Sequence, residues 1–541
     1  QKFYEDRDWE LAWTRDGKPT RTATEMIQLF TDADKKGLRP DDYDGQRWQE
    51  HLHNVLAAPK DENAVAQFDV ALSVAAVRYL NDLHLGRINP QSLNFDINVP
   101  AKRASFDVAT LLNEQIVDES DIASVADGLE PQNPLFKATE HALPHYLELA
   151  EKVSAQPQPE LPTVEKPVAA GGNYPAMEPL VQRLALEGDG TPQLNGNQYT
   201  PEVAQAVQHF QTRMGLNADG KLSAQTLEQL NVPMSVRVQQ IDDALEKWRW
   251  LPEDYAKPRL LVNLPEFLVR AYTADGNLDF KMRVVDGEAK GNHDTPVFVR
   301  TMKYLIFRPY WNLPVSIVKK ELLRHLGGGN GYLEAHGYEV INSSAQPVSN
   351  WSAADLEHSR FLVRQKPGPK NSLGLVKFMF PNEYDIYMHS TPEMNLFNLA
   401  RRDRSHGCIR LNDAEKMANW VLQGQSEWDA DKIHQAMYGE PLQGENAESN
   451  AAAQQPASSD VESGVSSTSG QVKDNKQVNL KTQLPVVITY LTANADEDGT
   501  MHFFNDVYGY DKELETALAK PRPFSRSPVK INPKLTPGET E

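Results

Sequence analysis

The sequence predicts a multidomain α+β protein with a helical N-terminal scaffold, a small three-helix domain and a mostly β domain that carries an insertion. At 541 residues the chain is too long for one hydrophobic core, and its length suggests three or four domains. Apolar residues recur at helical spacing as far as residue 250, whereas β-branched and apolar runs broken by turns begin at residue 259. This change of pattern divides a helical N-terminal half from a β-rich part.

The composition excludes several classes of partner. Lys and Arg number 55 against 75 Asp and Glu, which gives a net charge of −20. Non-specific binding to nucleic acid or to anionic lipid needs basic patches, so we expect neither. No apolar run approaches the roughly 18–20 residues of a transmembrane helix, so we expect no membrane-spanning segment in this chain. Because the chain begins at Gln1, we expect a signal peptide or an N-terminal anchor to be missing from this sequence.

Residues 1–150 have the pattern of a helical scaffold. A helix over 23–36 is followed by Gly37 and Pro40, which are typical of a helix end, and a second helix is expected over 68–85. Titratable residues do not cluster here as they do in catalytic sites, so a structural role is expected.

A proline-rich stretch over 151–172 predicts a semi-rigid extended linker. The small helical domain follows over 173–235, where Thr200 and Pro201 are typical of an N-cap and a first helical position. A connecting helix is expected within 236–258.

The β-rich part is expected to span 259–440. Strand-like runs cover the following segments: 259–263, 267–272, 280–285, 304–307, 375–380 and 384–388. Between them, residues 318–370 have the pattern of an insertion over the β core and are interpreted as a lid.

The C-terminal part divides at a low-complexity stretch. Residues 441–480 contain no aromatic residue and cannot bury enough apolar area to offset their ordering entropy, so disorder is predicted. Short strand-like runs follow, and we expect residues 481–541 to pack back on an earlier domain.

Chemistry concentrates at His389, His406 and Cys408, which lie within 20 positions and include the chain's single cysteine. Cys408 is predicted to lie in a tight turn near the start of a helix, where the helix dipole, a neighbouring imidazole and turn amides favour a thiolate. The amides of Gly407 and Cys408 are candidate donors to the oxyanion of a tetrahedral intermediate.

Three interpretations of this cluster compete. Cys/His acyl transfer needs a nucleophile, a base and a group that orients the base. Zinc accepts His and Cys ligands, but two of the three candidates are only two residues apart and the sequence offers no evident fourth ligand. The third interpretation is a buried cysteine with two hydrogen-bonded histidines. We favour acyl transfer, with no metal and no cofactor; the spacing leaves open whether His389 or His406 is the base.

The string over 405–410, Ser-His-Gly-Cys-Ile-Arg, follows a histidine 19 positions before the cysteine and resembles the signature of the L,D-transpeptidase catalytic domain, the YkuD-type fold. Nearly the whole chain resembles the long periplasmic L,D-transpeptidases of Gram-negative bacteria. Further matching segments are 3–4, 245–252, 295–298, 309–314, 488–490, 496–499 and 506–509. Residues 173–235 resemble a peptidoglycan-binding domain, with the matching segments 180–184, 200–203, 206–207, 210–211, 215–216 and 219–220.

The resemblance implies a role for each matching residue. Cys408 is the implied nucleophile, His389 the implied base and the Ser390 carbonyl the implied group that orients this base. His406 and Gly407 are implied to shape the site. The remaining residues expected to support the site or bind substrate are Tyr387, Ser405, Arg410 and Trp311, with Arg410 holding the turn or a substrate carboxylate.

The implied reaction is the formation of 3→3 cross-links in peptidoglycan. The cysteine takes an acyl group from a donor tetrapeptide stem with release of D-Ala, and a diaminopimelate amine of an acceptor stem then attacks the thioester. The resemblance also implies a periplasmic location, carbapenem sensitivity and other wall-synthesis enzymes as partners. Water as acceptor (an L,D-carboxypeptidase), a lipoprotein lysine as acceptor, and a non-enzymatic peptidoglycan-binding scaffold remain alternatives.

Overall fold

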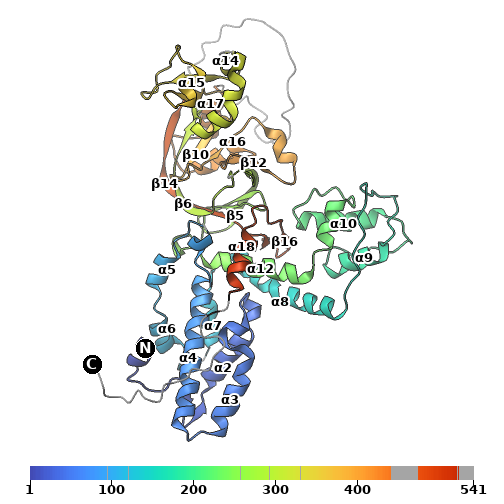
Figure 1. The fold of residues 1–541 in the computed structure, drawn as a ribbon, viewed down its shortest axis with the longest axis vertical. Coiled ribbons are helices and arrows are strands. Elements are labelled where there is room, and N and C mark those ends of the chain that lie inside the picture. Colours follow the sequence, from blue (N-terminus) through green and yellow to red (C-terminus); the bar gives the residue numbers. More distant parts are fainter. Residues whose placement is uncertain are drawn as a thin grey trace. The chain divides into compact units, whose positions relative to one another are not determined.

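The computed structural model describes residues 1–93, 95–119, 121–255, 257–291, 293–328, 331–439, 473–520 and 522. The chain forms two compact units (Figure 1). The first, called the helical unit, contains Gln1–Lys257, Asn263–Glu266 and the chain from Thr489 onward. The second, called the β unit, contains Pro258–Val262 and Phe267–Ile488.

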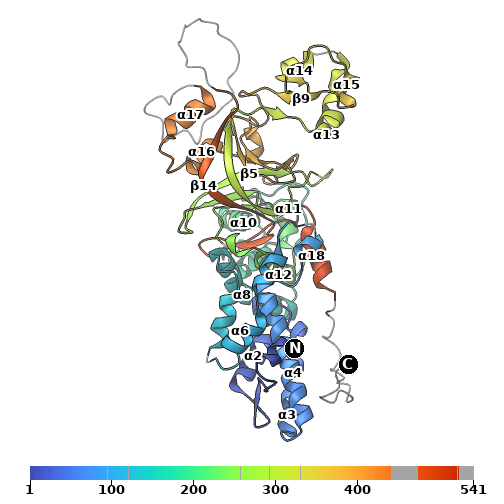
Figure 2. The ribbon, with the colours of Figure 1, turned by 90° about the vertical axis from the view of Figure 1, so that its left-hand side faces the viewer.

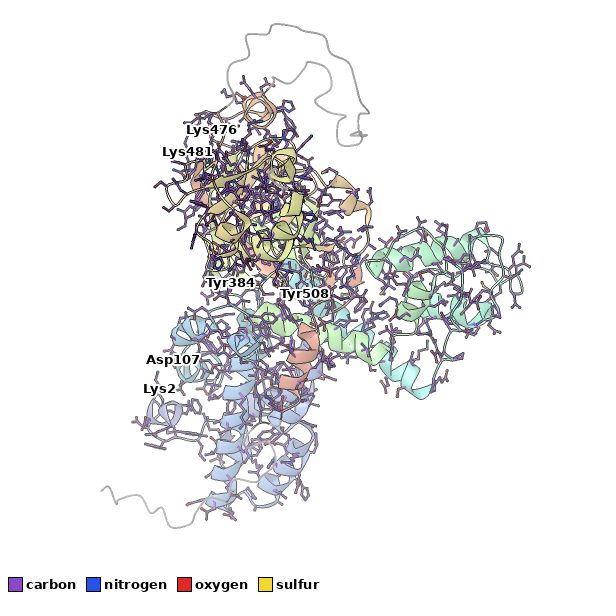
Figure 3. The ribbon with its side chains drawn as sticks, turned by 45° about the horizontal axis from the view of Figure 1, so that its top comes forward. Lys2, Asp107, Tyr384, Lys476, Lys481 and Tyr508 are labelled. Atoms are coloured by element: carbon purple, nitrogen blue, oxygen red, sulfur yellow. The ribbon has the colours of Figure 1, made fainter. Side chains whose placement is uncertain are left out.

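The N-terminal part of the helical unit is a bundle around an aromatic core. Its main helices are α2 (Arg21–Thr31), α3 (Trp48–Ala57), α4 (Glu62–Leu85), α6 (Val108–Gln115) and α7 (Ile122–Leu129). Phe30, Trp48 and Tyr79 are buried, and the Phe30 ring contacts both of the others, so the bundle excludes water at its centre. Lys2 and Asp107 form an ion pair that ties the N-terminal end to α6 (Figure 3).

The small helical domain is attached through two long helices that pack on each other, α8 (Pro134–Ala155) and α12 (Met234–Arg249). It contains α9 (Met177–Leu186), α10 (Pro201–Arg213) and α11 (Ala224–Leu230). The Thr200 hydroxyl caps α10, as the sequence predicts.

The stretch expected as a linker, 151–172, is partly helical and partly packed. Helix α8 continues to Ala155, and the Arg183 guanidinium donates to the carbonyl of Pro159. The Leu161 amide donates to Asn231. These contacts hold the stretch against the small domain, so it is not a freely extended spacer.

The C-terminal segment completes the helical unit. Strands β15 (Ala493–Ala495) and β16 (Met501–Phe503) pair with each other, and α18 (Tyr510–Leu518) packs against α12 (Figure 2). The Lys247 ammonium on α12 binds the Asp511 carboxylate, which also accepts from the Thr492 hydroxyl. Both charged side chains are buried. Removal of either one would leave the other as an unpaired buried charge, so the pair anchors α18 only while both members are present.

The β unit contains a sheet that closes on itself. Its strands are β3 (Leu260–Asn263), β4 (Leu268–Tyr272), β5 (Leu278–Gly287), β6 (Phe298–Phe307), β10 (Val376–Met379), β11 (Met388–His389), β12 (Asp403–Ser405), β13 (Ile409–Leu411) and β14 (Lys476–Thr489). Among the described residues the order is β12-β5-β13-β11-β10-β6-β14-β3-β4, and pairing of β4 with β5 closes an eight-strand barrel-like sheet. The predicted helical regions and β-rich domain are thus confirmed.

Strand β14 corrects the predicted limits of the low-complexity linker. It begins at Lys476 and pairs with β6, so residues 476–480 are strand where disorder was expected. Residues 441–472 of that linker lie outside the described part of the chain.

The cap is the insertion between β7 (Trp311–Asn312) and β9 (Leu362–Gln365). It contains α13 (Val315–Ile317), the single turn Val318–Leu322, α14 (Gly331–Ala335), β8 (Tyr338–Ile341) and α15 (Ala353–Glu357), and Figure 2 shows it as a separate lobe of the β unit. Its own small core includes Leu313, Leu322, Leu333, Val340 and Leu356. The insertion interpreted as a lid is therefore a folded subdomain with its own hydrophobic core.

Lys247→Met is expected to lower the free energy of unfolding of the helical unit by about 3–5 kcal/mol, because Asp511 would stay buried without its cation. Urea unfolding followed by tryptophan fluorescence, to which the buried Trp248 on α12 and Trp250 at its C-cap contribute, measures this loss. Lys247→Met combined with Asp511→Leu is expected to regain most of it. A single variant within about 1 kcal/mol of the wild type would contradict the anchoring role.

Candidate active site

A cavity of about 820 Å³ lies between the barrel sheet and the cap. Its lining on the sheet side includes Lys377, Met379, Tyr387, His389, Cys408 and Arg410, and on the cap side Trp311, Ile317, Glu321, Leu322, Tyr332 and Tyr338. The exposed ring of Tyr384 stacks on Phe298 beside the same cavity (Figure 3). All three residues of the predicted cluster, His389, His406 and Cys408, line this cleft.

Strand alternation places His389 and Cys408 on one face of the sheet. Strands β11 and β13 are parallel neighbours in the register Met388↔Ile409 and His389↔Arg410. Met388 and Ile409 are fully buried on the core side, so the flanking side chains His389 and Cys408 face the cleft. A shift of one residue in either strand would turn its cleft side chains into the core.

His389 is held in one tautomer. Its Nδ1 lies 2.5 Å from the carbonyl oxygen of Ser390. Because a carbonyl only accepts, Nδ1 carries the proton and the lone pair lies on Nε2. The ring also has a backbone hydrogen-bond contact with Leu373, which favours its protonated form. Gly374 packs so closely on Ser390 that a Cβ there would lie 2.5 Å from the Ser390 hydroxyl oxygen. Gly374 also has φ +60°, so a glycine is required for the backbone that supports this carbonyl.

The Cys408 thiol is partly exposed to the cleft. Its Sγ lies 3.6 Å from the Asp385 carbonyl oxygen, and the Tyr387 hydroxyl is a hydrogen-bond partner of the sulfur. The Tyr387 ring also contacts the His389 ring edge-on, with centroids 5.8 Å apart. Tyr387 therefore connects the thiol to the imidazole.

Both members of the Cys/His pair are neutral in the free protein. Burial raises the pKa of the Cys408 thiol to about 11, although hydrogen bonds from Tyr387 and the charges of Lys377 and Arg410 favour the thiolate. Burial, followed by the charge of Arg410, lowers the pKa of His389 to about 3, although the Ser390 carbonyl favours the protonated ring. Neighbouring groups thus favour the thiolate, as the sequence predicts, but desolvation outweighs them.

The helix start predicted over 412–415 is confirmed, but it does not directly follow Cys408. Strand β13 follows the cysteine directly, and the next helix, α16 (Ala414–Val421), begins only after the Asp413 cap. The sequence Asn-Asp-Ala-Glu over 412–415 does mark a helix start, but three strand residues separate it from the thiol.

Hydrogen bonds fix the turn before the nucleophile. The Ser405 hydroxyl accepts from the Gly407 amide at 3.1 Å and donates to the Cys408 carbonyl at 2.6 Å. The Thr295 hydroxyl donates to the Gly407 carbonyl at 2.7 Å and accepts from the Gly287 amide at 2.9 Å. Because the Gly407 amide already donates its hydrogen bond to the Ser405 hydroxyl, it is not the oxyanion donor suggested by the sequence. Gly407 has φ +113°, so its role is conformational.

Two predicted residues, His406 and Arg410, are paired with acidic side chains of the chain itself. The His406 Nε2 lies 2.7 Å from Oε1 of Glu321 on the cap. Arg410 forms an ion pair with Glu393, so its charge is already matched by a carboxylate of the chain. Trp311 lines the cleft from β7, as a substrate-binding role requires.

The sequence interpretation assigned no role to two cleft residues, Lys377 and Glu321, or to the buried Thr295 behind the turn. Lys377 lies on β10 directly opposite His389, and its position between the apolar residues Val376 and Phe378 is the alternation signal that predicts a cleft-facing side chain. Thr295 and Glu321 are distant in sequence from the motif, so only the fold shows their contacts.

The zinc alternative lacks a ligand set. Within the described ranges, no group of three or more His, Cys, Asp or Glu side chains is arranged to hold a metal ion.

The described part of the chain contains no helix that is long and apolar enough to cross a bilayer.

Three family models match the chain. Residues 1–143 match a Scaffold domain, residues 175–230 match the model described as "Putative peptidoglycan binding domain", and residues 257–433 match the L,D-transpeptidase catalytic domain. The last match covers the cleft and both members of the Cys/His pair.

A curated protein of Haemophilus influenzae named "Putative L,D-transpeptidase" is 25% identical over 262 residues. The aligned region covers 48% of this chain and 45% of that protein, so the match spans less than half of the relative's length. The chain thus combines regions that match a Scaffold domain, a putative peptidoglycan binding domain and an L,D-transpeptidase catalytic domain, and its sequence is similar to that of a putative L,D-transpeptidase.

Proposed function

We propose that the protein forms 3→3 cross-links in periplasmic peptidoglycan, with tetrapeptide stems as donor and acceptor. The observation that carries this proposal is the Cys408 thiol beside a neutral, Nδ1-protonated His389 in a cleft covered by a folded cap. A thiol nucleophile, a base and a carbonyl that orients the base are the three parts that acyl transfer needs.

In the first half-reaction, Cys408 Sγ attacks the carbonyl carbon of diaminopimelate, the third residue of the donor stem, and its proton passes to His389 Nε2. The bond to the fourth residue then breaks, and His389 returns the proton to the departing amine, so D-Ala leaves and a thioester remains. Because both groups begin neutral, proton transfer accompanies attack, and the thiolate is never exposed to solvent.

In the second half-reaction, the diaminopimelate amine of an acceptor stem attacks the thioester carbonyl while His389 takes its proton. Collapse of the tetrahedral intermediate expels the Cys408 thiolate, which recovers the proton and leaves an amide bond between two stems. The cap supports this outcome because a covered cleft limits hydrolysis of the thioester by water. In this proposal the small helical domain holds the enzyme on its polymeric substrate.

Cys408→Ala is expected to lower the rate of cross-linking by at least about 10⁴-fold, since it removes the nucleophile. Purified protein is incubated with disaccharide-tetrapeptide, and the products are identified by mass spectrometry. The expected product is a dimer that has lost one D-Ala, absent with Cys408→Ala and present with Lys416→Met, a change of an exposed lysine outside the cleft.

Other products would change the assignment. Tripeptide monomer alone would contradict transpeptidation to a stem and indicate water as the acceptor. Equal product from wild type and Cys408→Ala would contradict the nucleophile.

Alkylation of Cys408 tests the neutral resting state. A pKa of about 11 means that the thiol stays protonated until high pH, so the iodoacetamide rate is expected to be low at pH 7 and to rise about tenfold per pH unit past pH 9. The chain has one cysteine, so mass spectrometry of the intact protein reports this site alone. A rate that levels off near pH 8.5, as for a free cysteine, would contradict the buried neutral thiol.

A further inference from the structure

We propose that Lys377 is a specificity-determining residue that binds the free carboxylate of the donor residue leaving from the scissile bond. This inference rests on the proposed function and adds the group by which the enzyme selects a stem that ends one residue after the scissile bond.

The fold places Lys377 beside the reacting groups. It lies on β10 in the register Lys377↔His389 with β11, so both side chains share the cleft face of the sheet. Its Nζ lies 5.2 Å from the centroid of the Tyr387 ring, which contacts both the thiol and the imidazole. Its charge acts on Cys408 and on His389 alike.

Lys377 is a cation without an acidic partner. Within the described ranges, no carboxylate lies within ion-pairing distance of its ammonium, and the titratable group that acts on its pKa is the Cys408 thiol. Burial lowers the pKa of Lys377, which reports the cost of partly desolvating an unpaired ammonium. An anionic group of a ligand would offset this cost by pairing with the ammonium.

The other cleft cations differ in this respect. Arg410 is matched by Glu393. Arg324 is an exposed residue of the cap that donates to the ring of His325 and does not lie on the sheet with the Cys/His pair. Lys377 thus lies on the same face of the sheet as Cys408 and His389 and, among the described residues, has no carboxylate partner. The carboxylate-binding role that the resemblance offered for Arg410 fits Lys377 better.

The chemistry of the donor indicates which carboxylate binds. Cys408 attacks the carbonyl of the third residue, and His389 must deliver a proton to the nitrogen of the fourth. The terminal carboxylate lies only two bonds beyond that nitrogen, so it must lie near the same two side chains. A longer or amidated stem carries no charge at this position.

The experiment compares donors that differ in one carboxylate. Three donors are used: the tetrapeptide, the same peptide with a C-terminal D-Ala amide, and a peptide with lysine replacing diaminopimelate, which removes the side-chain carboxylate of the third residue. Release of the terminal residue is followed by mass spectrometry with full-length wild type, Lys377→Met, Lys377→Arg and the control Lys416→Met, whose ammonium lies 4.8 Å from the Phe280 ring outside the cleft.

The wild type is expected to prefer the free acid over the amide by about 10- to 100-fold in kcat/KM, mostly through KM. Lys377→Met should slow the acid by a similar factor, leave the amide within about threefold and so abolish the preference. Lys377→Arg should retain a preference, and Lys416→Met should match the wild type.

Three results would overturn the proposal. Equal wild-type rates on acid and amide would show that the terminal carboxylate is not recognised. Equal slowing of both donors by Lys377→Met would show that Lys377 acts on the Cys/His pair alone. Loss of discrimination only against the lysine-containing donor would assign Lys377 to the third residue's carboxylate. Failure of the wild type on every donor would instead contradict the proposed function itself. A urea unfolding midpoint of Lys377→Met equal to that of the wild type verifies that the variant is folded.

Discussion

The parallel pairing of β11 with β13 is the constraint on which the site depends. In the register His389↔Arg410, both strands turn their apolar residues into the barrel core and their polar residues toward the cap. The burial of Met388 and Ile409 therefore stabilises the sheet and fixes the direction of the base and the nucleophile at the same time. Catalytic geometry is thus a consequence of core packing, because a slipped register would expose apolar side chains.

Burial then sets the protonation states. The same desolvation that favours a neutral thiol disfavours an imidazolium, so the pair rests without charge separation. The Ser390 carbonyl leaves the lone pair of His389 on Nε2, and the turn formed by Ser405 and Thr295 holds the nucleophile. The cap adds Glu321, which binds His406, so the signature motif contacts both walls of the cleft. The reacting groups are therefore held in position while the thiol stays protonated.

Much of this could be predicted from the sequence where the signal is local. Helical periodicity identified the helical regions, β-branched runs identified the β-rich domain, and the spacing of His389 and Cys408 identified the candidate site. Predictions failed where long-range contacts decide. The strand after Cys408 forms because it completes the barrel, although the residues beyond it resemble a helix cap. Strand β14 begins at Lys476 because β6 offers it a partner. The pKa of Cys408 depends on burial that no local motif encodes, and Lys377 needed the register with His389 to be recognised.

The most direct test of the central claim is the ¹⁵N NMR titration of His389 in uniformly histidine-labelled protein, assigned by comparison with His389→Ala. The account predicts one neutral, Nδ1-protonated tautomer that does not titrate between pH 5 and pH 8, since burial holds its pKa far below that range. An imidazolium at neutral pH, or titration near the ordinary value of 6.5, would contradict the neutral thiol–imidazole pair.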